Sequence, residues 1–369
     1  MTEPDPSPNP PLVGRAECEL PRVEQVATPR PPQPRPGLVE GGLLTVGFLV
    51  VLLGTMIGIV LVAFLLAAIA RQGDALNVPE GAKPGTVGGI PPAITEAVAW
   101  SVAIAYAAGL MYALLVLRIV VGRNWAREAG LLRFPLPHVL LGLLALPGFV
   151  VLSDVLARFF FWVTRMEHLM DQSSDLGALF KPFHWSFAVL AIGIGPGVVE
   201  ELWCRGFLGR GFVGRCGWIG GVLLTSLAFG LLHMWPPPYV AVTAVMGVGL
   251  HFTYAMSRSL WVPIIIHTMN NSFAALTVVG TIPTAPMEQA GTDSPAAVIG
   301  LAVGTVLLVG LAMWTGRARV ATDPTARPPL RGVMVPGGAA SNMLGGKPNW
   351  LLVAAAGLCS GGLVWALFG

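Results

Sequence analysis

Nine long apolar runs constrain the fold more than any other feature of this sequence. They lie at 43–70, 97–121, 136–163, 183–208, 218–234, 239–256, 260–280, 296–314 and 350–368. A helix that crosses a bilayer needs about 20 predominantly apolar residues. The runs are too long and continuous for barrel strands, and only helices or closed barrels satisfy their backbone inside lipid. We therefore expect an all-α, polytopic bundle of eight or nine transmembrane helices, eight if 350–368 does not cross.

Composition supports a membrane protein whose main partner is the lipid bilayer. Hydrophobic residues make up 54% of the 369 residues and charged residues only 11%, whereas soluble domains carry about 25% charged residues. The net charge is +3, and no basic cluster with interleaved aromatic residues is present, so a nucleic-acid partner is not indicated. The four cysteines are widely spaced. This spacing indicates neither a disulfide framework nor a structural zinc site.

The N-terminal segment differs from the rest of the chain. Residues 1–36 contain eleven prolines and almost no apolar run, which predicts a disordered tail with polyproline II character. No cleavable signal peptide is evident, so we expect the first span to act as the insertion signal and remain. The predicted organisation is a tail at 1–40, N-terminal transmembrane helices at 41–135, a core at 136–285, and C-terminal helices with a basic loop at 286–369.

Lysine and arginine residues predict the orientation of the bundle. Counted over alternate loops, 17 lie on the side of the N-terminal tail and 5 on the opposite side. The positive-inside rule then places the N-terminus in the cytoplasm. Short loops and the absence of eukaryotic sorting signals favour a bacterial inner membrane.

Two adjacent glutamates lie in the apolar run at 183–208. A charge at the centre of a bilayer costs roughly 2.5–3.5 kcal/mol on insertion scales, so Glu200 and Glu201 need partners or a function. Arg205 follows Glu201 by four residues and can pair with it on one helix face, whereas Glu200 is rotated about 140° from Arg205. A buried ion pair without chemistry is the alternative. The Gly-Pro-Gly sequence at 195–197 should weaken or break this helix.

Two later runs carry a histidine with a partner four residues away. Phe229 can pack beside His233, and His267 and Asn271 can converge on one point. An interfacial histidine and interhelical hydrogen bonds are the simpler interpretations. Ionisable residues inside a membrane nevertheless indicate a functional site by default. Together with Glu200, these residues supply the carboxylate, imidazoles and amide needed to activate water and stabilise an oxyanion.

These segments resemble the three motifs of the CPBP intramembrane proteases, the family of the type II CAAX prenyl protease and the bacteriocin-processing enzymes. The motifs E-E-x-x-x-R, F-x-x-x-H and H-x-x-x-N occur here in the same order and spacing. The matching residues are Glu200, Glu201, Arg205, Phe229, His233, His267 and Asn271. The resemblance covers roughly residues 136 to 280, so the region 136–285 would be the protease core.

The resemblance implies hydrolysis of a peptide bond within or at the membrane. The substrate would be a peptide or protein, which could itself be membrane-anchored. In this interpretation Glu200 is the general base, left free by the pairing of Glu201 to meet His233, His267 and Asn271. His233 would orient the water or Glu200, and His267 and Asn271 would stabilise the oxyanion. Three residues would support them: Glu201, Arg205 and Phe229.

A metal-dependent version uses the same residues differently. Glu200, His233 and His267 form the two-histidine, one-glutamate set of an open catalytic zinc site, and the family is often labelled metalloprotease. Glu201 would then have to be the base, which fits poorly with its pairing to Arg205. The usual H-E-x-x-H signature is absent. We favour a route that needs no cofactor, with zinc or another divalent metal as the other option.

Two further functions compete with proteolysis. A non-catalytic relative could use the buried polar cluster to bind or protect a membrane partner, in an immunity or scaffold role. A transporter could relay protons through buried carboxylates, but no paired half-repeats are visible. A binding role would not require the base, both imidazoles and the amide, so the complete set favours the enzyme.

Overall fold

The computed structural model describes residues 35–69, 92–170, 179–234, 236–283, 289, 293–317, 319–320, 343–344 and 348–368. The described residues belong to one compact unit, Gln33–Gly369. Most of the predicted N-terminal tail, residues 1–34, lies outside the described residues. The predicted division of the rest into three regions remains a prediction.

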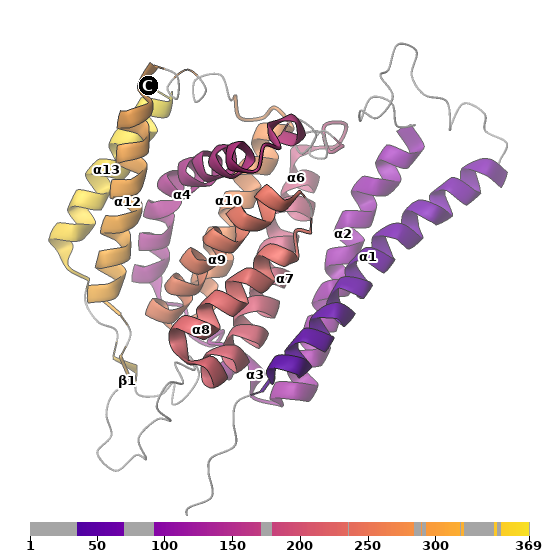
Figure 1. Cartoon of the computed structure of the whole chain (residues 1–369), viewed down its shortest axis with the longest axis horizontal. Helices are drawn as coiled ribbons and strands as arrows, with labels where there is room; N and C mark the ends of the chain where they lie inside the picture. Colours follow the sequence, from indigo (N-terminus) through magenta and orange to yellow (C-terminus); the bar gives the residue numbers. More distant parts are fainter. Residues whose placement is uncertain are drawn as a thin grey trace, which may run out of the picture. The chain divides into compact units, whose positions relative to one another are not determined.

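The described chain is almost entirely helical, as predicted (Figure 1). The elements before the predicted core are α1 (Leu38–Ile69), α2 (Pro92–Val116), η3 (Leu117–Val121) and α3 (Trp125–Glu128). The next two elements are α4 (Leu136–Val163) and η4 (Glu167–Leu169). The long helical stretch that follows turns at Gly217 and is called the kinked region. The kinked region contains α6 (Trp185–Ala188), η5 (Val189–Ile194), α7 (Gly195–Glu201), η6 (Leu202–Gly209) and α8 (Arg210–Leu231). The remaining elements are α9 (Pro237–Ser257), α10 (Trp261–Val278), α12 (Pro295–Thr315), α13 (Trp350–Phe368) and the short antiparallel pair β1 (Arg319–Val320) and β2 (Met343–Leu344).

Seven helical stretches in the described chain are long and apolar enough to cross a membrane. They are Leu38–Ile69, Ala93–Val121, Leu136–Val163, Trp185–Leu231, Pro237–Ser257, Pro295–Thr315 and Trp350–Phe368. Two features explain why this number is lower than the eight or nine transmembrane helices expected. The Trp185–Leu231 stretch is 47 residues long and turns at Gly217, where φ is 73°, so it contains two predicted runs. The run at 260–280 forms α10, whose histidine and asparagines make it less apolar than the seven stretches.

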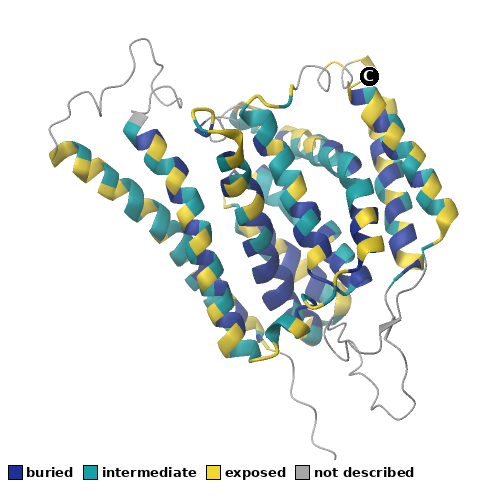
Figure 2. Cartoon of the chain, turned by 180° about the vertical axis from the view of Figure 1, so that it is seen from behind, coloured by how far each residue is buried: buried dark blue, intermediate teal, exposed yellow. Residues whose placement is uncertain are grey.

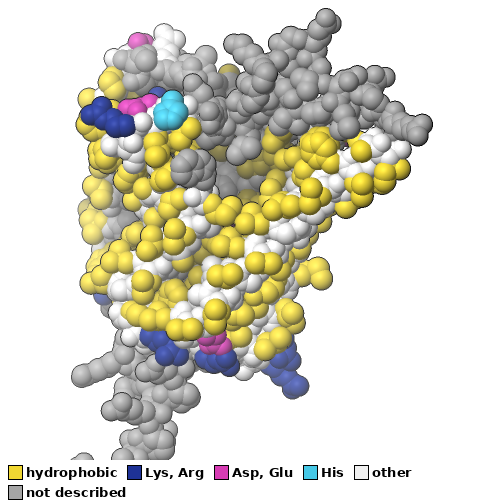
Figure 3. Space-filling model, turned by 45° about the vertical axis from the view of Figure 1, so that its right-hand side comes forward, with side chains coloured by type: hydrophobic (Ala, Val, Ile, Leu, Met, Phe, Trp, Pro, Cys, Tyr) yellow, Lys and Arg dark blue, Asp and Glu magenta, His cyan; other side chains and the backbone are white. Residues whose placement is uncertain are grey.

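The surface and the interior confirm an integral membrane protein. On the face drawn in Figure 3, apolar side chains cover the flanks of the helices, and lysine and arginine side chains gather near their ends. Burial differs sharply between helices (Figure 2). In the most apolar 18-residue window of α1 no residue is buried, whereas 61% of the corresponding window of Trp185–Leu231 is buried. The first motif and Phe229 of the second therefore lie in the most enclosed of these seven stretches, while the orientation of the bundle in the membrane remains a prediction.

Small residues bring α7 and η5 close to α10. A Cβ on Gly197 would lie 2.3 Å from the Thr268 hydroxyl, and one on Gly193 would lie 2.3 Å from the Ser272 hydroxyl. The two glycines are four residues apart, as are their two partners, so each pair shares a helix face. Small residues at this spacing let membrane helices approach closely. This approach places the end of α7 beside the middle of α10.

The chain stays helical through the Gly-Pro-Gly sequence, so of the predicted weakening or break only the break is excluded. Pro196 is the second residue of α7 and follows η5 directly, so the chain changes helix type next to the residue that lacks an N–H. The chain instead widens into π-helix on both sides of α7, at Val189–Ile194 and Leu202–Gly209. Single π-helical turns are rare and frequently mark functional sites.

Candidate active site

Glu201, the last residue of α7, is the centre of a buried polar cluster. Its Oε1 accepts a hydrogen bond from Arg205 Nη1 at 2.5 Å and lies 2.9 Å from His267 Nδ1. Glu201 and Arg205 are both 0% exposed. The pairing of Glu201 with Arg205 was predicted from their spacing, and the structure confirms it. The cluster therefore joins the first and third motifs directly.

Arg205 extends this cluster to α8 and α9. Its Nη2 donates to the backbone oxygen of Gly247 at 2.9 Å, and its guanidinium lies over the ring of Phe229, 4.5 Å from the centroid. A Cβ on Gly247 would lie 3.2 Å from the Phe229 ring, so a glycine suits this close approach of α9. Because an arginine donates in several directions from one plane, this side chain ties together the helices that carry the first two motifs.

His267 bridges Glu201 and Asn271. Its Nε2 lies 3.1 Å from Asn271 Nδ2, so the predicted convergence of these two residues is present. A neutral His267 with its proton on Nδ1 donates to Glu201 and accepts from the Asn271 amide. The carboxylate thus fixes the orientation of the ring, and the ring presents Nε2 toward Asn271.

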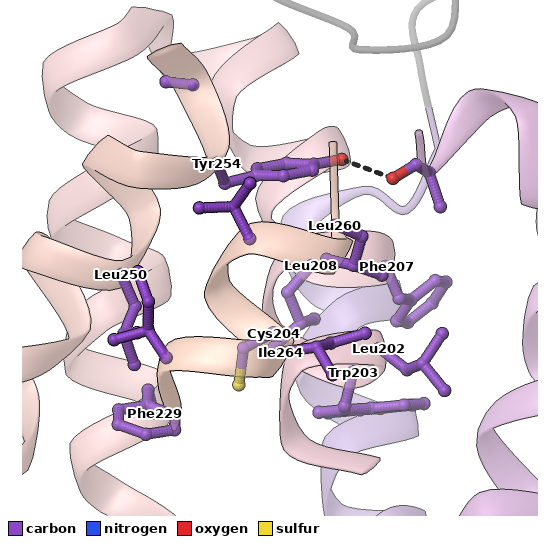
Figure 4. Close-up of a cluster of buried hydrophobic side chains, with 14 of the residues drawn as sticks. Leu202, Trp203, Cys204, Phe207, Leu208, Phe229, Leu250, Tyr254, Leu260 and Ile264 are labelled. Atoms are coloured by element: carbon purple, nitrogen blue, oxygen red, sulfur yellow. Dashed lines mark hydrogen bonds between the residues drawn. The ribbon is translucent and has the colours of Figure 1, made fainter. Parts of the chain in front are cut away.

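Phe229 is the point where the three motifs meet. Its ring is 2% exposed and makes edge contacts with His267, at 5.5 Å between ring centroids, and with His233, at 5.3 Å. His233 is half-buried in the turn after α8, and its Nδ1 lies 3.1 Å from the Phe229 backbone oxygen. Figure 4 shows Phe229 beside apolar side chains of the surrounding helices, including Leu250 and Cys204.

Glu200 faces a different helix from the one the sequence indicated. Its Oε1 accepts a hydrogen bond from the Tyr106 hydroxyl on α2 at 2.7 Å, and its Oε2 is buried with no hydrogen-bond partner in the described chain. The carboxylate that contacts His267 is Glu201, which corrects the expected partner of Glu200. Helical spacing shows that the two glutamates point apart, but it does not show that α10 lies beside one and α2 beside the other.

Sequence reasoning missed Tyr106. It lies 94 residues before Glu200, and no spacing rule connects residues so distant. The useful signal is a tyrosine within the apolar run at 97–121, since a buried phenol normally finds a hydrogen-bond partner.

The predicted metal ligands do not assemble. Within the described ranges, no group of three or more histidine, cysteine, aspartate or glutamate side chains is arranged to hold a metal ion. Glu200, His233 and His267 all fall in those ranges. Their recorded hydrogen-bond partners differ: the Tyr106 hydroxyl for Glu200, the Phe229 backbone oxygen for His233, and the Glu201 carboxylate for His267. The arrangement does not fit the zinc version of the site.

The comparison with protein families identifies the segment that carries these motifs. Residues 182–273 match the model of the family described as type II CAAX prenyl endopeptidase Rce1-like. This segment of the chain is Rce1-like. All three motifs lie inside it, which confirms the resemblance to the CPBP proteases. The Rce1-like segment includes most of α10 but excludes α1, α2, α12 and α13.

No curated protein and no solved structure shows significant similarity to the chain.

Proposed function

We propose that the chain is an intramembrane endopeptidase that hydrolyses a peptide bond near the membrane face. The observation that carries the proposal is the meeting of the three motifs at Phe229 and Glu201 within the Rce1-like segment. The family description names an endopeptidase, and the cluster supplies a carboxylate, imidazoles and an amide. The substrate class is a peptide or protein segment that reaches the site from the bilayer.

Glu200 acts as the general base. One of its oxygens is held by Tyr106 while the other has no partner in the described chain, so the second oxygen is available to a water molecule. A buried polar atom without a partner is unusual and calls for an explanation such as an unseen water. A positioned general base contributes about 10²–10⁴-fold to a rate. His233 orients this water or the carboxylate.

His267 and Asn271 stabilise the oxyanion. To donate to the oxyanion from Nε2, His267 must carry a proton on that nitrogen as well as on Nδ1, which faces Glu201. The Asn271 amide supplies a second donor beside Nε2. A single oxyanion donor contributes about 10²–10³-fold. Glu201 and Arg205 hold His267 in place and take no part in the proton transfer.

The bond changes are those of simple hydrolysis. The water oxygen bonds to the substrate carbonyl carbon while Glu200 accepts the water proton on its free oxygen. The carbonyl oxygen becomes the oxyanion held by His267 and Asn271. Collapse of this intermediate breaks the C–N bond, and the proton passes from Glu200 to the departing amine nitrogen.

The direct test compares membrane-protein termini in cells that make the wild type or the Glu200→Gln variant. We expect new termini with the wild type and none with Glu200→Gln, measured by mass spectrometry at matched protein levels. Asp154→Asn is the control, because Asp154 is an exposed carboxylate paired with Arg158 on α4. The same termini from wild type and Glu200→Gln would rule out Glu200 as the base.

The cofactor requirement has its own test. We propose that cleavage needs no metal, because no three histidine, cysteine, aspartate or glutamate side chains of the described chain are arranged to hold one. Purified protein stripped with a chelator should keep its activity, and added zinc should not raise it. Loss of cleavage after stripping, with recovery on adding zinc, would contradict the metal-free route.

A further inference from the structure

Tyr106 is the residue outside the Rce1-like segment that contacts the proposed base. It lies on α2 and donates from its hydroxyl to Glu200 Oε1 at 2.7 Å. Glu200 is only 5% exposed, and its Oε2 has no hydrogen-bond partner among the described residues. The described contacts of the Glu200 carboxylate are therefore asymmetric, with one oxygen fixed and the other open.

Close packing between α2 and α7 fixes the position of Tyr106. A Cβ on Gly195, the first residue of α7, would lie 3.2 Å from the Tyr106 Cβ. On α2, a Cβ on Gly109 would lie 3.4 Å from Val199. Gly109 follows Tyr106 by three residues, so both lie on the α2 face that meets α7. Small residues on both helices allow the phenol to reach the carboxylate.

A second tyrosine on the same helix provides a comparison. The Tyr112 hydroxyl donates to the Leu44 backbone oxygen at 3.1 Å, which ties α2 to α1. Such a bond is the ordinary interhelical use of a polar side chain in membrane proteins. Tyr106 differs because its acceptor is the side chain that we assign as the base.

We propose that Tyr106 is a positioning residue that holds the Glu200 carboxylate so that its free oxygen faces the attacking water. The proposal rests on the proteolytic function above. A glutamate side chain has several staggered rotamers, and a hydrogen bond to one oxygen selects among them. Oε1 accepts from Tyr106 whether or not Oε2 carries the water proton, so the restraint persists through the reaction. The catalytic site then requires α2 as well as the Rce1-like segment.

The kinetic test removes one hydroxyl. Tyr106→Phe keeps the ring that packs against Gly195, and we expect kcat to fall about 10- to 100-fold, the rate equivalent of one hydrogen bond to a charged group. KM should change less than about twofold, because binding of substrate is not affected. Tyr112→Phe removes the comparable hydroxyl from the same helix and should leave both constants unchanged.

A double variant separates positioning from a general effect on folding. Tyr106→Phe should cause no further loss in a Glu200→Gln background, because the restrained group is already absent. A structural defect would lower activity by the same factor in both backgrounds. Wild-type kcat in Tyr106→Phe, or a full additional loss in the double variant, would overturn the proposal.

A measurement without substrate makes the contact testable by itself. The infrared band of the Glu200 carboxyl group is isolated by subtracting the Glu200→Gln spectrum from that of the full-length wild type in bilayers. We expect Tyr106→Phe to shift this band and Tyr112→Phe to leave it in place. An unshifted band overturns the proposal. If Tyr106→Phe shifts the band but the wild type cleaves no membrane protein, the contact exists and the proteolytic function is wrong. The catalytic role of this contact is then overturned as well.

Discussion

The two sides of α7 place adjacent, chemically identical residues in different environments. On the side facing α10 and α9, Glu201 is fully buried with Arg205 and His267 as partners. On the side facing α2, Glu200 has one neutral phenol as partner, and one of its oxygens has no partner in the described chain. Oε2 of Glu201 likewise has no partner in the described chain, so the two sides differ in what holds Oε1: an arginine and a histidine for Glu201, and a tyrosine hydroxyl for Glu200.

In the proposed mechanism, Glu201 stabilises the fold and Glu200 takes part in the reaction, although both lie at the end of one helix. Breaking a buried ion pair by removing one partner leaves an uncompensated charge and is strongly destabilising. Changing a carboxylate that is held by one hydrogen bond is much less costly to the fold. We therefore expect variants on the Glu201 side to affect folding, and variants on the Glu200 side to affect turnover.

The largest expected effect is on stability. Arg205→Met removes the cation beside Glu201 and should lower the free energy of unfolding by about 3–5 kcal/mol. The measurement is thermal or denaturant unfolding of the purified protein in detergent micelles.

The matched control restores neutrality. Glu201→Gln combined with Arg205→Met removes both charges and should be more stable than Arg205→Met alone. If the double variant is the less stable of the two, the charge of Glu201 is not what makes Arg205 necessary.

The next effect is on turnover and tests the oxyanion donors. Asn271→Ala should lower kcat about 10²-fold or more by removing one donor, and His267→Ala should act in the same direction. Thr277→Ala is the control on α10, because the Thr277 hydroxyl donates to the Ala274 backbone oxygen of its own helix, whereas Asn270 donates to the Asn271 side chain. A Thr277→Ala loss as large as that of Asn271→Ala would show that the loss comes from helix packing.

A smaller effect concerns the spacing between α7 and α10. The added methyl group in Gly197→Ala would approach the Thr268 backbone nitrogen to 2.8 Å, and such overpacking typically costs about 1–3 kcal/mol. Unfolding should be easier and cleavage slower. Gly54→Ala on α1, where nothing lies within 4 Å, should leave both unchanged.

The smallest effect concerns an exposed ion pair on α4. Asp154 and Arg158 pair at 2.8 Å with side chains 59% and 63% exposed. Asp154→Asn should change the free energy of unfolding by no more than about 1 kcal/mol. A loss comparable with that of Arg205→Met would mean that burial is not what separates the two ion pairs.

Local spacing predicted much of the fold and of the site. Apolar run length indicated the helices, and positions four residues apart indicated the contacts of Glu201 with Arg205, Phe229 with His233, and His267 with Asn271. These contacts depend on the geometry of a single helix, which the sequence encodes directly. All three are present in the structure.

Contacts between helices could not be predicted in the same way. Nothing in the spacing of Glu200 shows that α2 is its neighbour, and the phenol of Tyr106 has no motif around it. The glycines at 193 and 197 carried a usable signal, because small residues four apart favour close helix approach. The π-helical segments beside α7 also change the helical phase on which spacing arguments rely.

The division between the two glutamates is tested most directly by measuring kcat per folded molecule and the unfolding temperature for Glu200→Gln and Glu201→Gln side by side. We predict that Glu200→Gln unfolds within about 3 °C of the wild type but loses about 10²–10⁴-fold in kcat. Glu201→Gln should unfold at a clearly lower temperature while its folded fraction keeps more activity than Glu200→Gln. The reverse pattern, with a stable but inactive Glu201→Gln and an active Glu200→Gln, would contradict the assignment.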